Sequence, residues 1–132
     1  MFSKRALALV VPLTTVTLLG IANPASAKDG DDREVQRVGQ CSASADWKLK
    51  AKQDDGRIEV ELEVDSNRVG QTWSVRLTDN GTQVFAGRRV TRGPSGSFSV
   101  ERHTANRPGV DRFVGTARNV ATGETCTARL SF

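Results

Sequence analysis

The chain has 132 residues, enough for one domain, with a net charge of +4 and a hydrophobic content of 37%. It contains two cysteines and one histidine. We expect no metal site, because one histidine and two cysteines that can bond to each other do not supply the usual set of nitrogen and sulfur ligands. No cofactor is expected either.

The first 27 residues have the pattern of a secretory signal peptide. Two basic residues precede a mostly apolar stretch, 6–22, and residues 25–27 (Ala-Ser-Ala) form a small-x-small cleavage pattern. The alternative is a membrane anchor, but proline and threonine interrupt the apolar stretch and no stop-transfer charges follow closely. We therefore expect 1–27 to be removed and the protein to be secreted, extracellular and without a stable membrane anchor.

The next segment, 28–40, is charged and nearly devoid of large apolar residues. Such a composition is typical of a flexible lead rather than of packed structure. We therefore expect the folded domain to span 41–132.

The stretch 41–64 alternates apolar and polar residues on both sides of Asp55-Gly56. A period of two indicates strands with one solvated face, and Asp-Gly favours a two-residue type I′ turn between them. The charge and the apolar pattern agree on one register. That register joins the pairs Lys52–Glu59, Lys50–Glu61, Lys48–Glu63, Trp47–Val64 and Leu49–Leu62.

A second hairpin is predicted around Asn80-Gly81, the dipeptide most typical of tight hairpins. Its register would pair Leu77 with Val84 and would send Phe85 to the outer face, beside Arg76. Three further strands are expected near 97–102, 110–120 and 125–132. Their inward residues would be Phe98, Val100, Phe113, Gly115, Ala117, Cys126, Ala128, Leu130 and Phe132.

Seven strands with short turns and no helical period after residue 27 predict an all-β antiparallel sandwich of two sheets. Cys41 and Cys126 each lie on the apolar side of their strand, so we expect an intramolecular disulfide; an intermolecular bond and two buried thiols are the alternatives. Both tryptophans fall on the inward side and are expected in the core.

The run 109–119, followed by Thr122-Gly123-Glu124, resembles the last two strands of immunoglobulin-like and fibronectin type III-like domains. Trp73 stands where such domains place a core tryptophan. Two departures are Phe113, in place of the usual tyrosine, and cysteines that join the first and last strands. The overall layout also resembles small secreted proteins of actinobacteria that have no assigned activity. The resemblance implies a seven-stranded antiparallel immunoglobulin-like β-sandwich, and a fold alone says little about function.

No arrangement of residues points to catalysis, and we do not expect an enzyme. His103 is predicted to be an exposed loop residue, with no nucleophile motif near it in the sequence. Glu59, Glu61 and Glu63 are predicted to face lysines on a solvated surface rather than to serve as paired catalytic acids. Asp54-Asp55-Gly56 reads as a turn and lacks the other ligands of a calcium loop.

The charge distribution suggests a binding surface. Residues 66–132 contain ten arginines and four acidic residues, a net charge of +6, which favours anionic partners. A tentative binding patch consists of Arg76, Phe85, Arg89 and Arg92, an aromatic residue among arginines.

The expected function is that of a secreted, monomeric, non-catalytic binding module. Its partner would be a protein or an anionic cell-wall polymer, with nucleic acid disfavoured by the extracellular location. The alternative is a secreted small-molecule carrier with an apolar cleft between its sheets.

Overall fold

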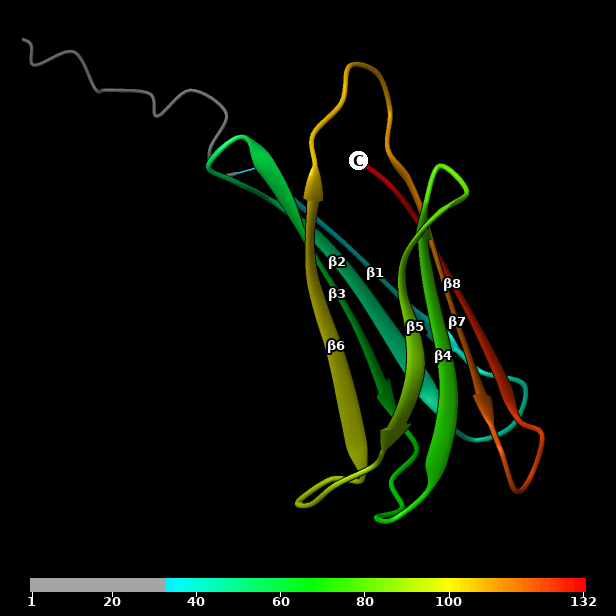
Figure 1. Ribbon diagram of the computed structural model, residues 1–132. Helices are drawn as coiled ribbons and strands as arrows, with labels where there is room; N and C mark the ends of the chain where they lie inside the picture. Colours follow the sequence, from blue (N-terminus) through cyan, green and yellow to red (C-terminus); the bar gives the residue numbers. More distant parts are fainter. Residues whose placement is uncertain (1–32) are drawn as a thin grey trace, which may run out of the picture.

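Residues 33–132 are described by the computed structural model, and they form two four-stranded antiparallel sheets packed face to face (Figure 1). The strands are β1 (Glu34–Gln40), β2 (Asp46–Asp54), β3 (Arg57–Asp65), β4 (Thr72–Asp79), β5 (Thr82–Val90), β6 (Ser97–Ala105), β7 (Arg112–Asn119) and β8 (Thr125–Ser131). The all-β prediction is confirmed, with eight strands instead of seven. The predicted signal peptide and the start of the predicted lead, 28–32, lie outside the described residues. Within 33–132 there is no helix of the length and apolarity needed to cross a membrane.

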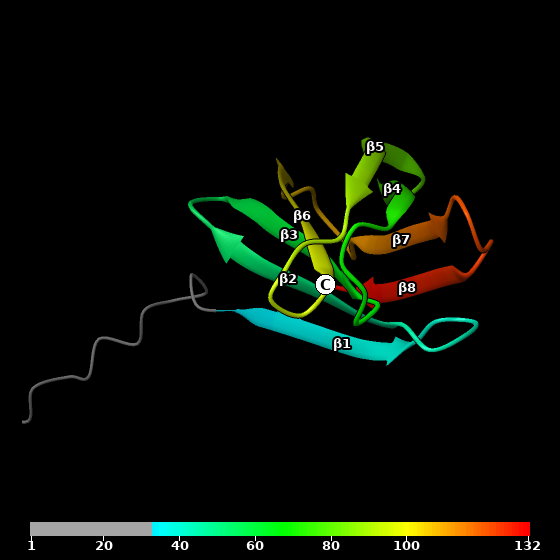
Figure 2. The same ribbon diagram turned by 90° about the horizontal axis from the view of Figure 1, so that it is seen from below.

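The strand order is β1-β2-β3-β6 in the first sheet and β5-β4-β7-β8 in the second. Seen from below, the two layers are distinct (Figure 2). Between the layers, β1 and β2 contact β8, and β5 contacts β6. The β3–β4, β5–β6 and β6–β7 connections pass between the layers, so no sheet is built from consecutive strands alone.

The β2–β3 hairpin has the predicted register in every pair, from Trp47 opposite Val64 to Lys52 opposite Glu59. Asp55 and Gly56 both have positive φ, 47° and 74°, as a type I′ turn requires. Of the predicted charge pairs, Lys48 and Glu63 form an ion pair at 3.8 Å.

The β4–β5 hairpin has the predicted Asn80-Gly81 turn but not the predicted register. A β-bulge follows Leu77, so that Leu77 pairs with Phe85 and not with Val84. The extra residue moves Phe85 to the inner face, where it packs against the core. The predicted outward position of Phe85 is therefore wrong.

Strand β1 is the eighth strand, and it corrects the prediction of a flexible lead up to residue 40. Its seven residues pair with β2, from Glu34 opposite Lys52 to Gln40 opposite Asp46. Val35 packs against the core. The segment is an edge strand held mainly by backbone hydrogen bonds, which a hydrophobicity pattern does not reveal.

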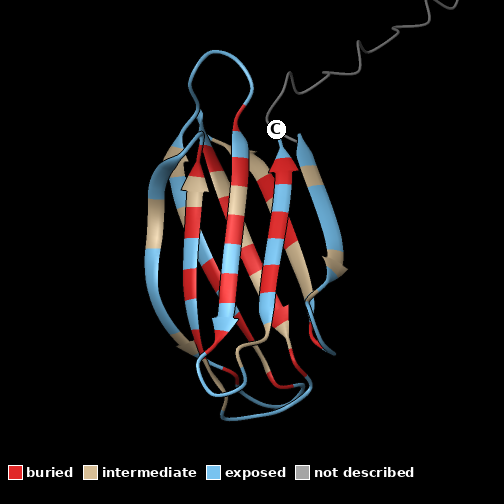
Figure 3. Ribbon diagram, turned by 90° about the vertical axis from the view of Figure 1, so that its right-hand side faces the viewer, coloured by how far each residue is buried: buried red, intermediate tan, exposed pale blue. Residues whose placement is uncertain are grey.

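Strand β6 extends to Ala105, three residues beyond the predicted end, so His103 lies on a strand and not in a loop. Inner and outer residues alternate along β6, β7 and β8 as predicted, and Figure 3 shows this alternation as bands of buried and exposed residues. Trp73 is fully buried, as predicted. Trp47 is only partly buried, because it lies near the edge strand β1, where its indole covers Gly39.

The predicted disulfide between Cys41 and Cys126 is present, with the two Cα atoms 4.3 Å apart. Cys126 lies in β8 and Cys41 in the β1–β2 connection, so the bond joins the two sheets. At the other end of β1, the guanidinium carbon of Arg33 lies 4.3 Å from the centre of the Phe132 ring, so the first described residue contacts the last residue of the chain.

Candidate functional site

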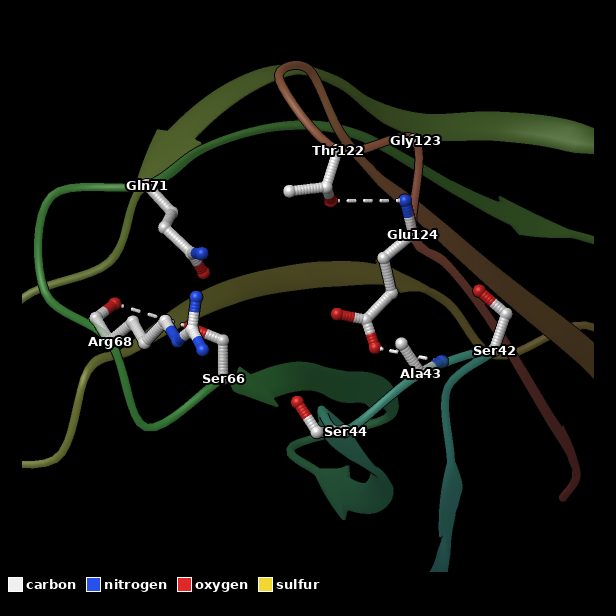
Figure 4. Close-up of a pocket in the computed structure, with 9 residues that line it drawn as sticks. All are labelled: Ser42, Ala43, Ser44, Ser66, Arg68, Gln71, Thr122, Gly123 and Glu124. Atoms are coloured by element: carbon white, nitrogen blue, oxygen red, sulfur yellow. Dashed lines mark hydrogen bonds between the residues drawn. The ribbon is translucent and has the colours of Figure 1, made fainter.

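A pocket of about 390 Å³ opens at the end of the sandwich where β1, β3 and β7 finish (Figure 4). Three connections form its walls: 41–45 between β1 and β2, 66–71 between β3 and β4, and 120–124 between β7 and β8. The lining residues are Ser42, Ala43, Ser44, Ser66, Arg68, Gln71, Thr122, Gly123 and Glu124. None of them is aromatic or a large aliphatic residue. The pocket is therefore suited to a polar ligand.

The 66–71 connection is held from beneath by Thr91 and Gly96. The buried hydroxyl of Thr91 donates to the Arg68 carbonyl oxygen at 2.6 Å and accepts from the Gln71 backbone N–H at 2.9 Å. Gly96 has φ of +84°, and a side chain there would collide with the backbone of Arg68. These contacts fix the backbone from which the Arg68 and Gln71 side chains extend.

The other two walls are joined through Glu124. Its Oε2 atom accepts hydrogen bonds from the backbone N–H groups of Ala43 and Ala45, each at 3.0 Å. Within the β7–β8 connection, the Asn119 side chain accepts from the N–H groups of Ala121 and Thr122 at 3.0 and 3.1 Å. The disulfide between Cys41 and Cys126 also links the 41–45 connection to β8, next to Glu124. All three walls are thus ordered before any ligand arrives.

Two polar groups of the pocket, on Gln71 and Arg68, have no partner within the described residues. The Gln71 Oε1 atom is buried without a hydrogen bond. No carboxylate of residues 33–132 forms an ion pair with the Arg68 guanidinium, whose side chain extends into the pocket (Figure 4). A buried polar atom without a partner is costly, so a ligand that supplies a donor to Gln71 and an anionic oxygen to Arg68 would be bound favourably.

The tentative patch predicted from the sequence is brought together only in part. Phe85 and Arg89 are in contact, with the Arg89 guanidinium carbon 4.6 Å from the ring centre, and Arg102 lies at the same distance from that ring. Arg76 is exposed on the opposite face of its sheet, and Arg92 follows the end of β5. A binding role for these residues stays a prediction.

A buried pair of carboxyl groups, Asp79 and Asp111, lies towards the other end of the sandwich. Burial, followed by the hydrogen bond and the negative charge of Asp111, raises the pKa of Asp79 from 3.8 to about 6, although the positive charge of Arg107 acts in the opposite direction. Both Asp111 oxygens and the Asp79 Oδ1 atom lack other hydrogen-bond partners in the described part of the chain. The pair therefore favours holding one proton.

One group of side chains has the composition of a metal site. Asp54, Glu59 and His103 place one ligand atom each within 4.8 Å of one another. The sequence-based prediction considered cysteine and histidine ligands and did not combine the single histidine with these two acids.

Arg68, Gln71 and Glu124 were not singled out from the sequence. They lie in two connections, 66–71 and 120–124, with Arg68 and Glu124 56 positions apart along the chain, and no local motif joins them. The only local indication was the position of the loops themselves, since loops at one end of a sandwich often form binding sites. No protein family, curated protein or solved structure matches the chain.

Proposed function

We propose that this chain is a secreted, non-catalytic binding module that holds an anionic, hydroxyl-rich ligand in the pocket between 41–45, 66–71 and 120–124. The observation that carries the proposal is a preformed polar pocket that contains Arg68, with which no carboxylate of residues 33–132 forms an ion pair, and the buried Oε1 atom of Gln71, which has no hydrogen-bond donor among the same residues. Pre-ordered walls favour binding because little conformational entropy is lost when the ligand enters.

The disulfide supports the extracellular location, because such bonds persist mainly in oxidising compartments. Outside the cell, an anionic cell-wall polymer or an acidic segment of a protein offers the carboxylate or phosphate oxygens that a free guanidinium binds. We favour the polymer, because the hydroxyl groups of Ser44 and Thr122 line the same pocket as Arg68 and suit a polyol or sugar backbone.

We further propose that the sandwich is of the immunoglobulin-like type. The order β5-β4-β7-β8 corresponds to strands C′-C-F-G, and the buried Trp73 lies on β4, the counterpart of strand C. In this correspondence the β3–β4 and β7–β8 connections are the B–C and F–G loops. These loops carry antigen-binding residues in antibody variable domains, which is an analogy of position only.

The test is co-sedimentation of the protein, purified from culture supernatant, with purified cell walls. We expect saturable binding that falls about tenfold or more in the Arg68→Gln variant, because a charge-assisted hydrogen bond contributes roughly 1.5–3 kcal/mol. Walls from which anionic polymers have been extracted should bind neither protein.

Arg129→Gln is the matched control, since it removes one positive charge from an exposed residue outside both the pocket and the predicted patch. Equal losses in the two variants would indicate general attraction between a basic protein and an anionic wall. Unchanged binding of Arg68→Gln would contradict the assignment of the pocket.

The alternative of a small-molecule carrier receives less support. It requires an apolar cleft, whereas this pocket is lined by hydroxyl, amide and charged groups, and the space between the sheets is filled by the core. The carrier function stays a prediction. Binding of an apolar fluorescent probe that the cell-wall polymer does not displace would favour it.

A further inference from the structure

We propose that Asp54, Glu59 and His103 form a site for a divalent transition-metal ion, with zinc as the expected ion. The three side chains come from three adjacent strands, β2, β3 and β6, and all lie on the outer face of the first sheet. The site flanks the Asp55-Gly56 turn, at the end of the sandwich away from the polar pocket (Figure 1). It is thus independent of the proposed function.

The distances among the ligand atoms fit a small metal ion. The His103 Nε2 atom lies 3.2 Å from Asp54 Oδ2 and 3.4 Å from Glu59 Oε2. Around a tetrahedral zinc ion with bonds of about 2.0–2.2 Å, neighbouring ligand atoms are about 3.3–3.6 Å apart. The edge to Glu59 therefore already has the required length and the edge to Asp54 is about 0.1 Å short of it, and rotation of the carboxylates can adjust this edge and shorten the third.

The hydrogen-bonding alternative leaves part of this arrangement unexplained. A single ring nitrogen carries at most one proton, yet Nε2 faces two carboxylate oxygens. Glu59 also lies directly across from Lys52, its expected charge partner, but in the described part of the chain its carboxylate approaches His103 instead. A metal ion in the place of the proton would satisfy both carboxylates at once.

The charge and the rigidity of the site favour a cation. With a neutral imidazole the three side chains carry a total charge of −2. The Glu59 side chain is only 17% exposed, so its carboxylate is poorly solvated by water. Regular strands position all three residues, which limits the reorganisation on binding. Imidazole together with carboxylate selects zinc and related transition metals over calcium and magnesium, which prefer oxygen ligands alone. Three protein ligands leave the fourth position to water.

The single histidine makes the test direct, because its imidazole resonances belong to one known residue. We expect zinc, added to untagged protein from culture supernatant, to shift these resonances and to raise the melting temperature. Calorimetric titration should give one site per chain. Loss of a ligand in His103→Ala or Glu59→Gln should weaken zinc binding about tenfold or more, at least as much as loss of a residue that hydrogen-bonds to a metal ligand typically does.

Glu61→Gln is the matched control, since it removes the same charge from the same face of β3, two residues away. We expect it to keep binding within about twofold of the original protein, as a surface charge outside the ligand set contributes little. Unshifted imidazole resonances at saturating zinc would overturn the site. So would an equal loss of affinity in Glu59→Gln and Glu61→Gln, which would indicate attraction to a charged surface only.

Discussion

The Asp79 carboxyl group is more stable protonated in the folded protein than in the unfolded chain. Its pKa of about 6, against 3.8 for an unburied group, means that the folded form holds this proton more tightly. The contribution to stability is therefore complete below pH 4 and is lost as the pH rises through 6. At about 1.4 kcal/mol for each unit of pKa, the loss amounts to roughly 2–3 kcal/mol.

We predict that Asp79→Asn is more stable than the original protein at pH 7 and that this advantage shrinks towards pH 4. The amide keeps a hydrogen-bond donor towards Asp111 but does not ionise. Urea unfolding at several pH values measures the difference. The exposed Asp46→Asn is the control and should show no such trend. A difference for Asp79→Asn that is constant between pH 4 and 7 would contradict the prediction.

At the scale of elements, the structure of β1 differs from the sequence-based prediction for the N-terminal segment. The composition of 28–40 predicts a lead that contributes nothing to stability, whereas the structure pairs 34–40 with β2 and packs Val35 against the core. We predict that deleting 28–40 from the secreted form lowers the free energy of unfolding by about 1 kcal/mol or more, since full burial of a valine contributes roughly 1.5–3 kcal/mol and Val35 is partly buried.

Denaturant unfolding measures this loss, and deletion of 28–32 alone is the control. The deletion that removes β1 should also promote association, because it leaves the backbone groups of β2 as an unpaired sheet edge. An unchanged unfolding midpoint after deletion of 28–40 would contradict this prediction and would support a flexible lead.

The sequence predicted the elements best where a local turn and a local pattern agree. Asp55-Gly56 and the alternation around it determine every pair of the β2–β3 hairpin. The β4–β5 register could not be predicted, because the bulge after Leu77 depends on how Phe85 fits against the other sheet. His103 was assigned to a loop because polar residues at an edge strand have no apolar alternation to mark them.

The candidate site was predictable only as a location. Loops at one end of a sandwich are common binding sites, but Arg68 and Glu124 meet through the sheet topology and not through a sequence motif. The metal group likewise depends on β3 pairing with β6, a contact between residues 44 positions apart in the case of Glu59 and His103. Such pairings become evident only in three dimensions.

At the scale of the whole molecule, the disulfide joins the two sheets across 85 positions of the chain. Closing a loop of this length restricts the unfolded chain and stabilises the fold by up to about 4–5 kcal/mol. We predict that the Cys41→Ser, Cys126→Ser double variant unfolds at a markedly lower denaturant concentration. It should also bind cell walls more weakly, because 41–45 loses its covalent attachment beside Glu124.

Unfolding curves and the co-sedimentation assay measure the two effects separately. A less stable variant that keeps full wall affinity at a temperature where it is folded would show that hydrogen bonds alone order the pocket. That outcome would limit the role of the disulfide to stability.

The contact between Arg33 and Phe132 has a practical consequence for orientation. Strand β1 begins beside this contact and β8 ends beside it, whereas the polar pocket lies at the opposite ends of both strands. A tether attached before residue 33 or after residue 132 is therefore joined to the domain at the end remote from the pocket. A domain immobilised through either terminus would therefore present its pocket outward, accessible to large polymers in solution.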